Sequence, residues 1–411
     1  MNRVLPLFIF VFLISEFQVH AQIMKLQSVF QEVKANNSRL KVYDERISAS
    51  DINASGVTAW EAPKVGASFW MMPYQFSNTG FLVLSAEQMF KNSQKTKARK
   101  NLMDGMSSID QSEKKYTLNE LLFQAQSDYY SCIILTKKLF LLDRIENVFQ
   151  YIFKSAEMRY AYNGEKLSEI YKAKLDALEI SVQKKNLLNQ INVKKIELNA
   201  LMSRDVNVEF DVDTLYELNN YETILIDTAA LKNRRSDLGL LDQKMKIAAL
   251  SQKLEMSNAY PDYGLKYEHM NAFGGFPNAF SLMGSISIPM LPWVSKEYKA
   301  KSASFDYTIK SLQDEKKAML SDAVSKATGL LITMNSLQEE LAIYKKKIIP
   351  AAEDYYIVSM QAYEQNSENL QSVLMSLVKW QSIQMDYLDK TGDLLQVQTQ
   401  YEKELEIKES N

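Results

Sequence analysis

Two windows of the chain alternate apolar and polar residues with a period of two, which is typical of half-exposed β-strands. In residues 262–270, tyrosines and a leucine at every second position alternate with charged residues and a glycine. Residues 280–290 alternate in the same way after the turn-forming pair Gly274-Gly275. The first half of the chain has an equivalent pair of runs at residues 64–72 and 81–89. The pattern predicts two strand pairs, one in each half.

The rest of the chain has the periodicity of long helices. Residues 90–162 contain no proline, and in residues 293–365 only Gly329 and Pro350 interrupt the helical pattern. At 1.5 Å per residue, either stretch reaches about 100 Å. Residues 165–203 are also helical and carry apolar residues at heptad spacing, which indicates a coiled-coil seam. The sequence therefore predicts a mainly α protein with a small β part.

The order of elements occurs twice along the chain. Pro63, at the start of one strand run, has a counterpart in Pro261, and Tyr160 has one in Tyr363. The offset of about 200 residues is too long for a solenoid repeat and indicates a duplicated structural unit. The predicted parts are a signal peptide at 1–21, a first repeat at 22–220 with a helical tip at about 160–170, a second repeat at 221–411 with a helical tip at about 363–373, and an irregular segment at about 203–235.

The first 21 residues have the three parts of a secretory signal peptide. Residues 1–3 carry a positive charge, residues 4–14 are apolar, and small residues at 19–21 form a cleavage site before Gln22, where a lipoprotein would have cysteine. No later run approaches about 18 uninterrupted apolar residues, so no transmembrane helix is expected. The single cysteine, Cys132, excludes an intramolecular disulfide.

Composition excludes several classes of function. The net charge of −2 points to no polyanionic partner such as nucleic acid. After the signal peptide His269 is the only histidine, and the sequence has neither a glycine-rich phosphate loop nor a Cys or His metal cluster. The 19 methionines are scattered in the way of core residues. We therefore expect no catalytic residues, no cofactor and no bound metal.

Two interpretations of the strand pairs remain open at this point. They are either surface hairpins on a soluble helical protein or strands that cross a bilayer, for which roughly nine to eleven residues suffice. Two hairpins cannot close a barrel, and open sheet edges are not tolerated in lipid, so the second interpretation requires several chains to pool their strands. Trp60 and Trp293, which flank the first and last strands, would then lie at one membrane interface.

The order of these elements resembles the TolC-like outer-membrane efflux proteins over residues 24–405. The motifs that carry the resemblance are residues 198–202 before the irregular segment, residues 288–290 at the end of the last strand, and residues 348–350 ahead of Tyr363. The resemblance implies duplicated coiled-coil hairpins that form a periplasmic α-barrel tunnel. It also implies that each chain adds four strands to a trimeric, twelve-stranded outer-membrane β-barrel.

The same resemblance implies a function and a set of partners. The chain would be the outer-membrane exit duct of a tripartite efflux pump, extending into the periplasm and conducting substrate passively. Its partners would be two further copies of itself, a periplasmic membrane-fusion adaptor, an inner-membrane transporter of the resistance-nodulation-division type, and outer-membrane lipid. The overall likeness is to the heavy-metal branch of the family.

The resemblance gives the two helical tips a role in adaptor contact and tunnel constriction. Family members have an aromatic residue three positions before a glycine at each tip. Here Tyr160 precedes Asn163 and Tyr363 precedes Asn366, and asparagine tolerates the left-handed conformation of a helical turn. Arg159 and Tyr160 reproduce the basic and aromatic pair of the family.

The gate predicted from the resemblance departs from the family pattern. Glu169 and Tyr363 occupy its acid and tyrosine positions, but Glu368 stands where an arginine is expected, and two carboxylates repel. We expect a different closure that uses Arg159, with solvated tip residues of no gating role as the alternative. Pro350 predicts a kink or break in the helix before the second tip.

The competing function is that of a soluble periplasmic coiled-coil adaptor or scaffold protein without a membrane barrel. Pump adaptors also have long helical hairpins, but they flank one hairpin with glycine-rich β-domains. This chain has 12 glycines and places strand pairs at two equivalent positions. The arrangement of the strands therefore favours the duct.

Overall fold

The computed structural model describes residues 22–75, 79–161, 166–216, 218–219, 221 and 228–407. The predicted signal peptide, residues 1–21, lies outside this part of the chain. The chain divides into two compact units. Unit 1 comprises Met1–Glu32, Asp128–Glu217 and Ile349–Asp389, and unit 2 comprises Val33–Ser127, Leu218–Ile348 and Lys390–Asn411. Each unit takes segments from both predicted repeats.

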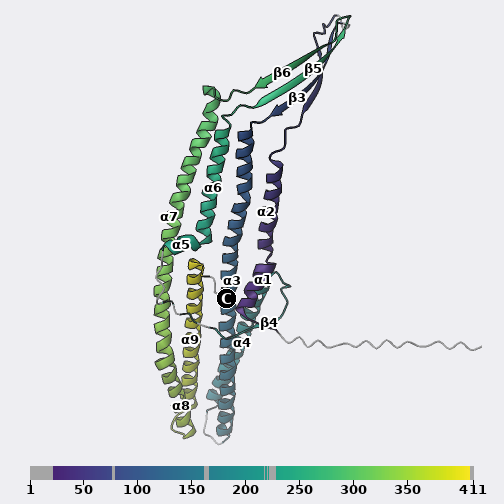
Figure 1. Cartoon of the computed structure of the whole chain (residues 1–411). Coiled ribbons are helices and arrows are strands. Elements are labelled where there is room, and N and C mark those ends of the chain that lie inside the picture. The colour runs from purple at the N-terminus through teal and green to yellow at the C-terminus, as the bar shows by residue number, and fades with distance from the viewer. Residues whose placement is uncertain are drawn as a thin grey trace, which may run out of the picture. The chain divides into compact units, whose positions relative to one another are not determined.

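Helices make up most of the described residues, as the hydrophobic pattern predicts (Figure 1). The helices are α1 (Leu26–Asn36), α2 (Ser38–Gly56), α3 (Ser93–Tyr160), α4 (Leu167–Leu201), α5 (Thr228–Arg234), α6 (Ser236–Ser257), α7 (Pro292–Ile343), α8 (Ile349–Glu364) and α9 (Leu370–Leu405). The strands are β1 (Gln22–Met24), β2 (Lys64–Trp70), β3 (Gly80–Phe90), β4 (Phe210–Val212), β5 (Tyr263–Phe273) and β6 (Ala279–Ile286). Among the described helices, none combines the length and the apolar character needed to span a membrane.

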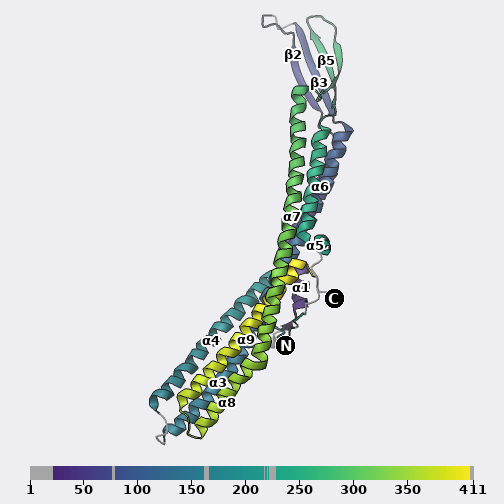
Figure 2. The same ribbon diagram turned by 90° about the vertical axis from the view of Figure 1, so that its left-hand side faces the viewer.

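Unit 1 is a bundle in which α4, α8 and the adjoining parts of α3 and α9 lie side by side (Figure 2). The buried residues of α3 recur at helical spacing, as in Leu142, Ile145, Phe149 and Ile152, so one face of the helix forms the core. Strands β1 and β4 of this unit pair in parallel. The buried Tyr129 hydroxyl donates a hydrogen bond of 2.8 Å to the Met24 carbonyl and so fixes β1 to the bundle.

The coiled-coil seam predicted in residues 165–203 is only partly buried. Ile191, Leu198 and Met202 lie in the core, whereas Leu188 is exposed. The segment predicted to be irregular, about 203–235, contains the strand β4 and the helix α5 in its described part. The sequence pattern missed these short elements because three to seven residues are too few to show a period.

Unit 2 combines helices with an antiparallel sheet. Helix α6 packs along α7, and the sheet has the strand order β2-β3-β5-β6 (Figure 1). The predicted strand pairs are thus joined through the contact of β3 with β5. Gly274 and Gly275 have φ values of 78° and 86°, which suit the tight turn between β5 and β6.

Pro350 is the second residue of α8, which a short π-helical segment, Tyr344–Ile348, connects with α7. Proline has no main-chain N–H and its ring crowds the preceding turn, and a π turn accommodates such a change in hydrogen bonding. The helical path is therefore continued through a π segment rather than broken. A kink at Pro350 stays a prediction.

Candidate functional site

The register of the sheet gathers apolar side chains on one face. Paired residues of an antiparallel ladder point to the same side of the sheet. One row across the four strands contains Val65, Ala86, Tyr267 and Leu282. The next row contains Ala67, Leu84, His269 and Phe280. The apolar face predicted from the period of two is therefore continuous across all four strands.

The opposite face of the sheet carries its charged residues, together with apolar ones such as Val83 and Met270. One row across it holds Lys64, Glu87 and Lys266, which alternate in sign from β2 to β5. Lys266 also forms an ion pair of 2.7 Å with Glu268 on the same strand. The four-stranded sheet is thus amphipathic, with its charges confined to one side.

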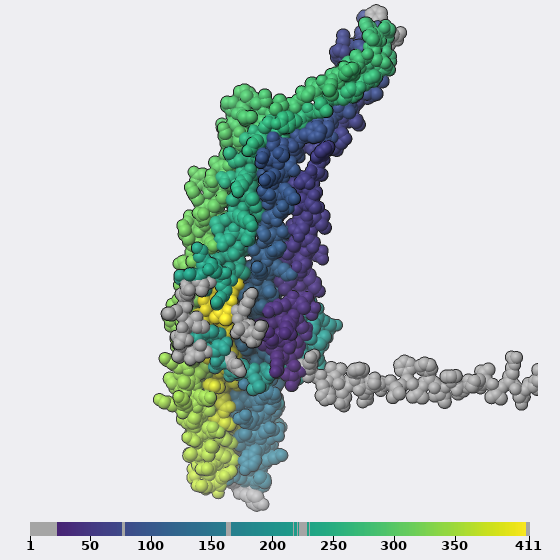
Figure 3. Space-filling model, viewed as in Figure 1, coloured from purple at the N-terminus to yellow at the C-terminus, as the bar shows by residue number. Residues whose placement is uncertain are grey.

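The apolar face is open in this chain. Phe280 is 72% exposed, and Val65, Leu282 and Ile286 are exposed as well. In the space-filling view the strands extend beyond the helices of unit 2 (Figure 3). An exposed apolar surface of this extent marks contact with a membrane or a partner.

Both tryptophans predicted at the membrane interface lie near the helix-proximal end of the sheet. Trp60 precedes β2, is 79% exposed and contacts Phe90 edge to face, with ring centroids 5.6 Å apart. Trp293 is in the first turn of α7 and is 75% exposed. Because β2 begins and β6 ends at this end of the sheet, both tryptophans lie at the same end of the strands.

The second predicted tip, in unit 1, is a tight turn between α8 and α9. Asn366 has a φ of 59°, in the left-handed region, and the Ser367 N–H donates to the Ala362 carbonyl at 2.9 Å, which closes the end of α8. Asn369 then caps α9, since its Oδ1 accepts the Ser372 N–H at 2.9 Å. The turn is therefore fixed by Asn366, which tolerates the left-handed conformation, and by Asn369, which caps the next helix.

Packing beneath the turn holds the tip rigidly. Tyr363 is 0% exposed, and Leu370 and Val373 at the start of α9 are also fully buried. Tyr356 stacks on Trp380 with ring centroids 5.5 Å apart and an interplanar angle of 3°. Burial raises the pKa of the Tyr356 hydroxyl above its ordinary value.

Arg159, at the end of α3, contacts the second tip directly. Its Nη1 donates to Asn366 Oδ1 at 2.8 Å, and its Nη2 donates to the Glu364 carbonyl at 3.1 Å. The guanidinium carbon lies 4.1 Å from the centre of the Tyr363 ring, within the range of a cation–π contact. Three of the predicted tip residues are thus brought together by one side chain.

The other predicted tip residues are not joined to this contact. One carboxylate oxygen of Glu169, Oε2, is buried and has no hydrogen-bond partner among the described residues. Glu368 is exposed, and Tyr160 is exposed at the end of α3. Asn163 lies outside the described residues.

An exposed apolar stripe on α4 was missed by the sequence analysis. Tyr171, Leu175, Leu178 and Val182 recur at spacings of three and four and are all exposed. The spacing is visible in the sequence and could have been recognised as one helix face. An exposed stripe of this kind is typical of a surface that packs against another helix.

The described residues contain no group of three or more His, Cys, Asp and Glu side chains that could hold a metal ion. His269, which the sequence analysis considered, lies on the apolar face of the sheet between Leu84 and Phe280. Its neighbours offer neither a nucleophile nor a carboxylate.

No protein-family model matches the chain, and no curated protein matches it in sequence. Solved structures do match in fold. The Vibrio cholerae outer membrane protein VceC has 14% identity and a TM-score of 0.73, covering 92% of this chain and 95% of its own. The Campylobacter jejuni CmeC outer membrane channel has 12% identity and a TM-score of 0.71, covering 98% and 94%. CusC, described as forming a transmembrane channel, has 10% identity and a TM-score of 0.75, covering 92% and 91%. The chain has the fold of these channel proteins.

Proposed function

We propose that this protein is the outer-membrane exit duct of a tripartite efflux pump, which extends into the periplasm and conducts substrate passively to the outside. The observation that carries the proposal is the amphipathic sheet, whose apolar face is exposed across all four strands. Strands that cross a bilayer have this division, with apolar residues toward lipid and polar residues toward the lumen. The likeness in fold to outer-membrane channels supports the same function.

The sheet edges support a homotrimer. Strands β2 and β6 each have one paired neighbour in the described chain, and an unpaired edge is not tolerated in lipid. Three chains that pool their sheets would form the twelve-stranded barrel and remove every edge. The exposed stripe of α4 around Leu175 and Leu178 would then pack against a helix of a second copy. On this proposal, each of the two repeats supplies two of the four strands of the sheet.

The tips would be the periplasmic end of the duct. There Arg159, Tyr160, Asn163, Tyr363 and Asn366 would contact a membrane-fusion adaptor, through which the duct meets an inner-membrane transporter of the resistance-nodulation-division type.

Arg159 would also replace the arginine expected where Glu368 stands, holding the two tips of one chain together. Glu169 would line the constriction. Trp60 and Trp293 would mark the periplasmic interface of the barrel.

A pair of substitutions on neighbouring positions of β6 tests the proposal. Leu282→Arg places a charge in the middle of the apolar face, whereas Ser281→Arg places the same charge on the polar face opposite Glu268. A lipid-facing arginine near the middle of a bilayer costs about 2–4 kcal/mol. We therefore expect Leu282→Arg to abolish outer-membrane trimers, measured by membrane fractionation and native mass spectrometry, and Ser281→Arg to leave them intact.

The competing function, a soluble periplasmic adaptor or scaffold, gives a different result. The wild type would then be recovered without detergent as a soluble monomer, and the two arginine variants would behave alike. Either finding would reject the duct.

A further inference from the structure

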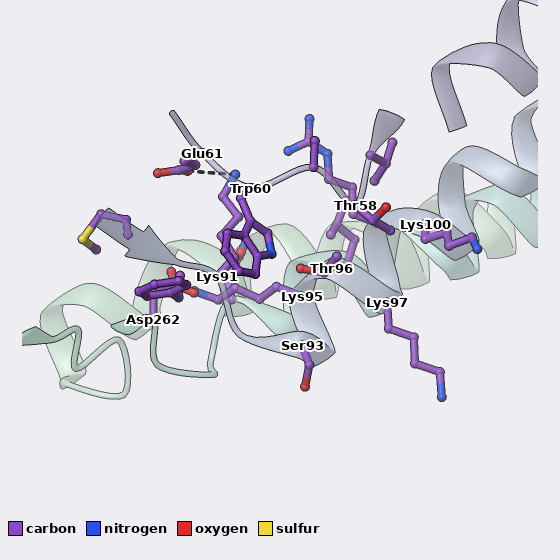
Figure 4. Close-up of a pocket in the computed structure, with 17 residues that line it drawn as sticks. Thr58, Trp60, Glu61, Lys91, Ser93, Lys95, Thr96, Lys97, Lys100 and Asp262 are labelled. Carbon is purple, nitrogen blue, oxygen red and sulfur yellow. Dashed lines mark hydrogen bonds and ion pairs between the residues drawn. The ribbon is translucent and has the colours of Figure 1, made fainter. Parts of the chain in front are cut away.

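A cavity of about 700 Å³ lies in unit 2, where the sheet meets the helices (Figure 4). Its lining comes from the end of α2 and the following segment, from the β3–α3 junction, and from the end of α6. The basic residues that line it are Lys91, Lys95, Lys97, Arg99 and Lys100. The acidic ones are Glu61 and Asp262, so the lining has a formal charge of +3 in a chain whose net charge is −2.

Asp262 fixes one side of the cavity. Its Oδ1 accepts the Asn92 N–H at 2.9 Å and its Oδ2 accepts Lys95 Nζ at 2.6 Å, so the start of β5 is tied to the start of α3. Its own N–H donates to Ser287 Oγ at 2.7 Å. Figure 4 shows the Lys95 side chain directed toward Asp262, with Trp60 beside it. These contacts assign Lys95 and Asp262 a structural role.

The remaining positive charges of the lining are not neutralised in the same way. Lys91 pairs with Glu61 at 3.0 Å, but Lys97, Arg99 and Lys100 form no ion pair among the residues that the structure describes. Lys97 and Lys100 project away from Asp262 (Figure 4). They are exposed, as is Arg99. The cavity therefore has three basic side chains free to bind an anion.

Their position conflicts with the usual charge pattern of helices. The N-terminus of a helix favours negative charge. The first eight residues of α3 nevertheless include four basic residues, Lys95, Lys97, Arg99 and Lys100, and its first turn has no acidic residue. Local rules of this kind are commonly broken where a site needs the residues for function. The main-chain N–H groups at the start of α3 add to the attraction for an anion.

The opposite wall of the cavity is aromatic. Trp60 and Phe90 line it, and the register of the sheet places Phe90 in the apolar face together with Tyr263 and Ile286. The cavity thus lies between the apolar face and a basic helix end. This combination matches an amphiphile whose anionic group lies next to its hydrocarbon part.

We propose that the cavity binds the phosphate group of a membrane phospholipid, with Lys97, Arg99 and Lys100 on the phosphate and Trp60 and Phe90 against the adjoining acyl chains. The site rests on the proposed function, because it takes the apolar face to lie in a bilayer. Bound lipid would tie the helix end to the inner leaflet and fix the depth of the sheet in the membrane.

Lipid binding to the purified protein in detergent, followed by native mass spectrometry, tests the site. The probes are a short-chain phosphatidylglycerol, the diacylglycerol with the same chains but no phosphate, and inorganic phosphate. The variant is Lys97→Gln/Arg99→Gln/Lys100→Gln. Its matched control is Lys115→Gln/Lys244→Gln/Lys246→Gln, which removes three exposed charges of the same unit that do not line the cavity.

We expect wild type and control to bind phosphatidylglycerol saturably and the diacylglycerol far more weakly. The cavity variant should lose affinity on the order of 100-fold, since each basic residue near an anionic lipid surface contributes roughly fivefold. The variant Lys97→Arg/Lys100→Arg keeps the positive charges, so it should bind phosphatidylglycerol as the wild type does. The wild-type affinity should fall with added salt.

Equal affinity of the cavity variant and the control would overturn the site. Displacement of the lipid by an equal concentration of inorganic phosphate would also overturn it, and would show that the cavity takes free phosphate. Failure of the site is distinguishable from failure of the duct. If only the site fails, trimers still form in the outer membrane. If the duct fails, neither the wild type nor any variant forms them.

Discussion

The contact between Arg159 and the second tip can be removed from either side. Arg159→Ala deletes the guanidinium. Asn366→Gly deletes the acceptor Oδ1 and keeps the backbone, since glycine adopts a φ of 59° without strain. Tyr363→Phe keeps the ring beneath the guanidinium and is the matched control.

The magnitude follows from the contacts of Arg159. Two hydrogen bonds, of 2.8 and 3.1 Å, contribute about 0.5–1.5 kcal/mol each. The cation–π contact with Tyr363 adds about 0.5–1 kcal/mol in a partly exposed setting. Because the side chain is only half-buried, we take the lower part of these ranges, about 2 kcal/mol, which corresponds to roughly 30-fold in the equilibrium for opening the tip.

Amide hydrogen exchange of the tip measures this equilibrium directly. The Ser367 N–H is held by the Ala362 carbonyl, and it exchanges when the end of α8 opens. We expect Arg159→Ala to speed its exchange roughly 30-fold and Tyr363→Phe to change it little. Asn366→Gly should give a smaller effect, and the double variant should add little to Arg159→Ala, since both remove the same contact. Unchanged exchange in Arg159→Ala, or full additivity of the two substitutions, would refute the contact.

Four further outcomes test the structure elsewhere. Burial raises the pKa of Cys132 to about 11, so its thiol should resist iodoacetamide at pH 8 in the folded protein and react only after denaturation. Glu402 is buried and accepts hydrogen bonds from four side chains, so Glu402→Gln should lower the free energy of unfolding by about 1–3 kcal/mol in a denaturant titration. Burial raises the pKa of Glu406, and a raised carboxyl pKa stabilises the fold at low pH and loses that contribution as the pH rises through the folded value. Glu406→Gln should therefore reduce the loss of stability as the pH rises above 4.5, the ordinary pKa of this carboxyl, measured by the same titration. Gly80 has a φ of 124°, and a Cβ there would lie 2.7 Å from the Met71 carbonyl oxygen, so Gly80→Ala should lower the melting temperature of the assembled protein.

The sheet was largely predictable because its signal is local. A period of two fixes which residues share a face, and the observed register places the predicted apolar residues of all four strands together. The glycine pair at 274–275 gave the turn between β5 and β6. Pairing of β3 with β5 was not predictable in the same way, since it joins segments far apart in the chain and depends on how the helices bring them together.

The short and long-range features were hidden from the sequence. Strands β1 and β4 have three residues each and are stabilised by pairing with one another, so neither shows a pattern alone. Arg159 was expected at the closure, but its partners depend on the meeting of α3 with the turn after α8, which no periodicity encodes. The basic start of α3 did carry a signal, because it opposes the normal charge preference of a helix N-terminus.

On the proposed function, the tip contact would take the place of an arginine at position 368. In the family that the sequence resembles, the cation of the gate lies on the second hairpin and the acid on the first. Here the cation, Arg159, lies on the first hairpin, and it binds a neutral amide, a carbonyl and an aromatic ring on the second. None of these partners is a carboxylate, so the contact needs no acidic side chain. On that function, the cation at the second tip would come from the first hairpin, while Glu368 is exposed to solvent.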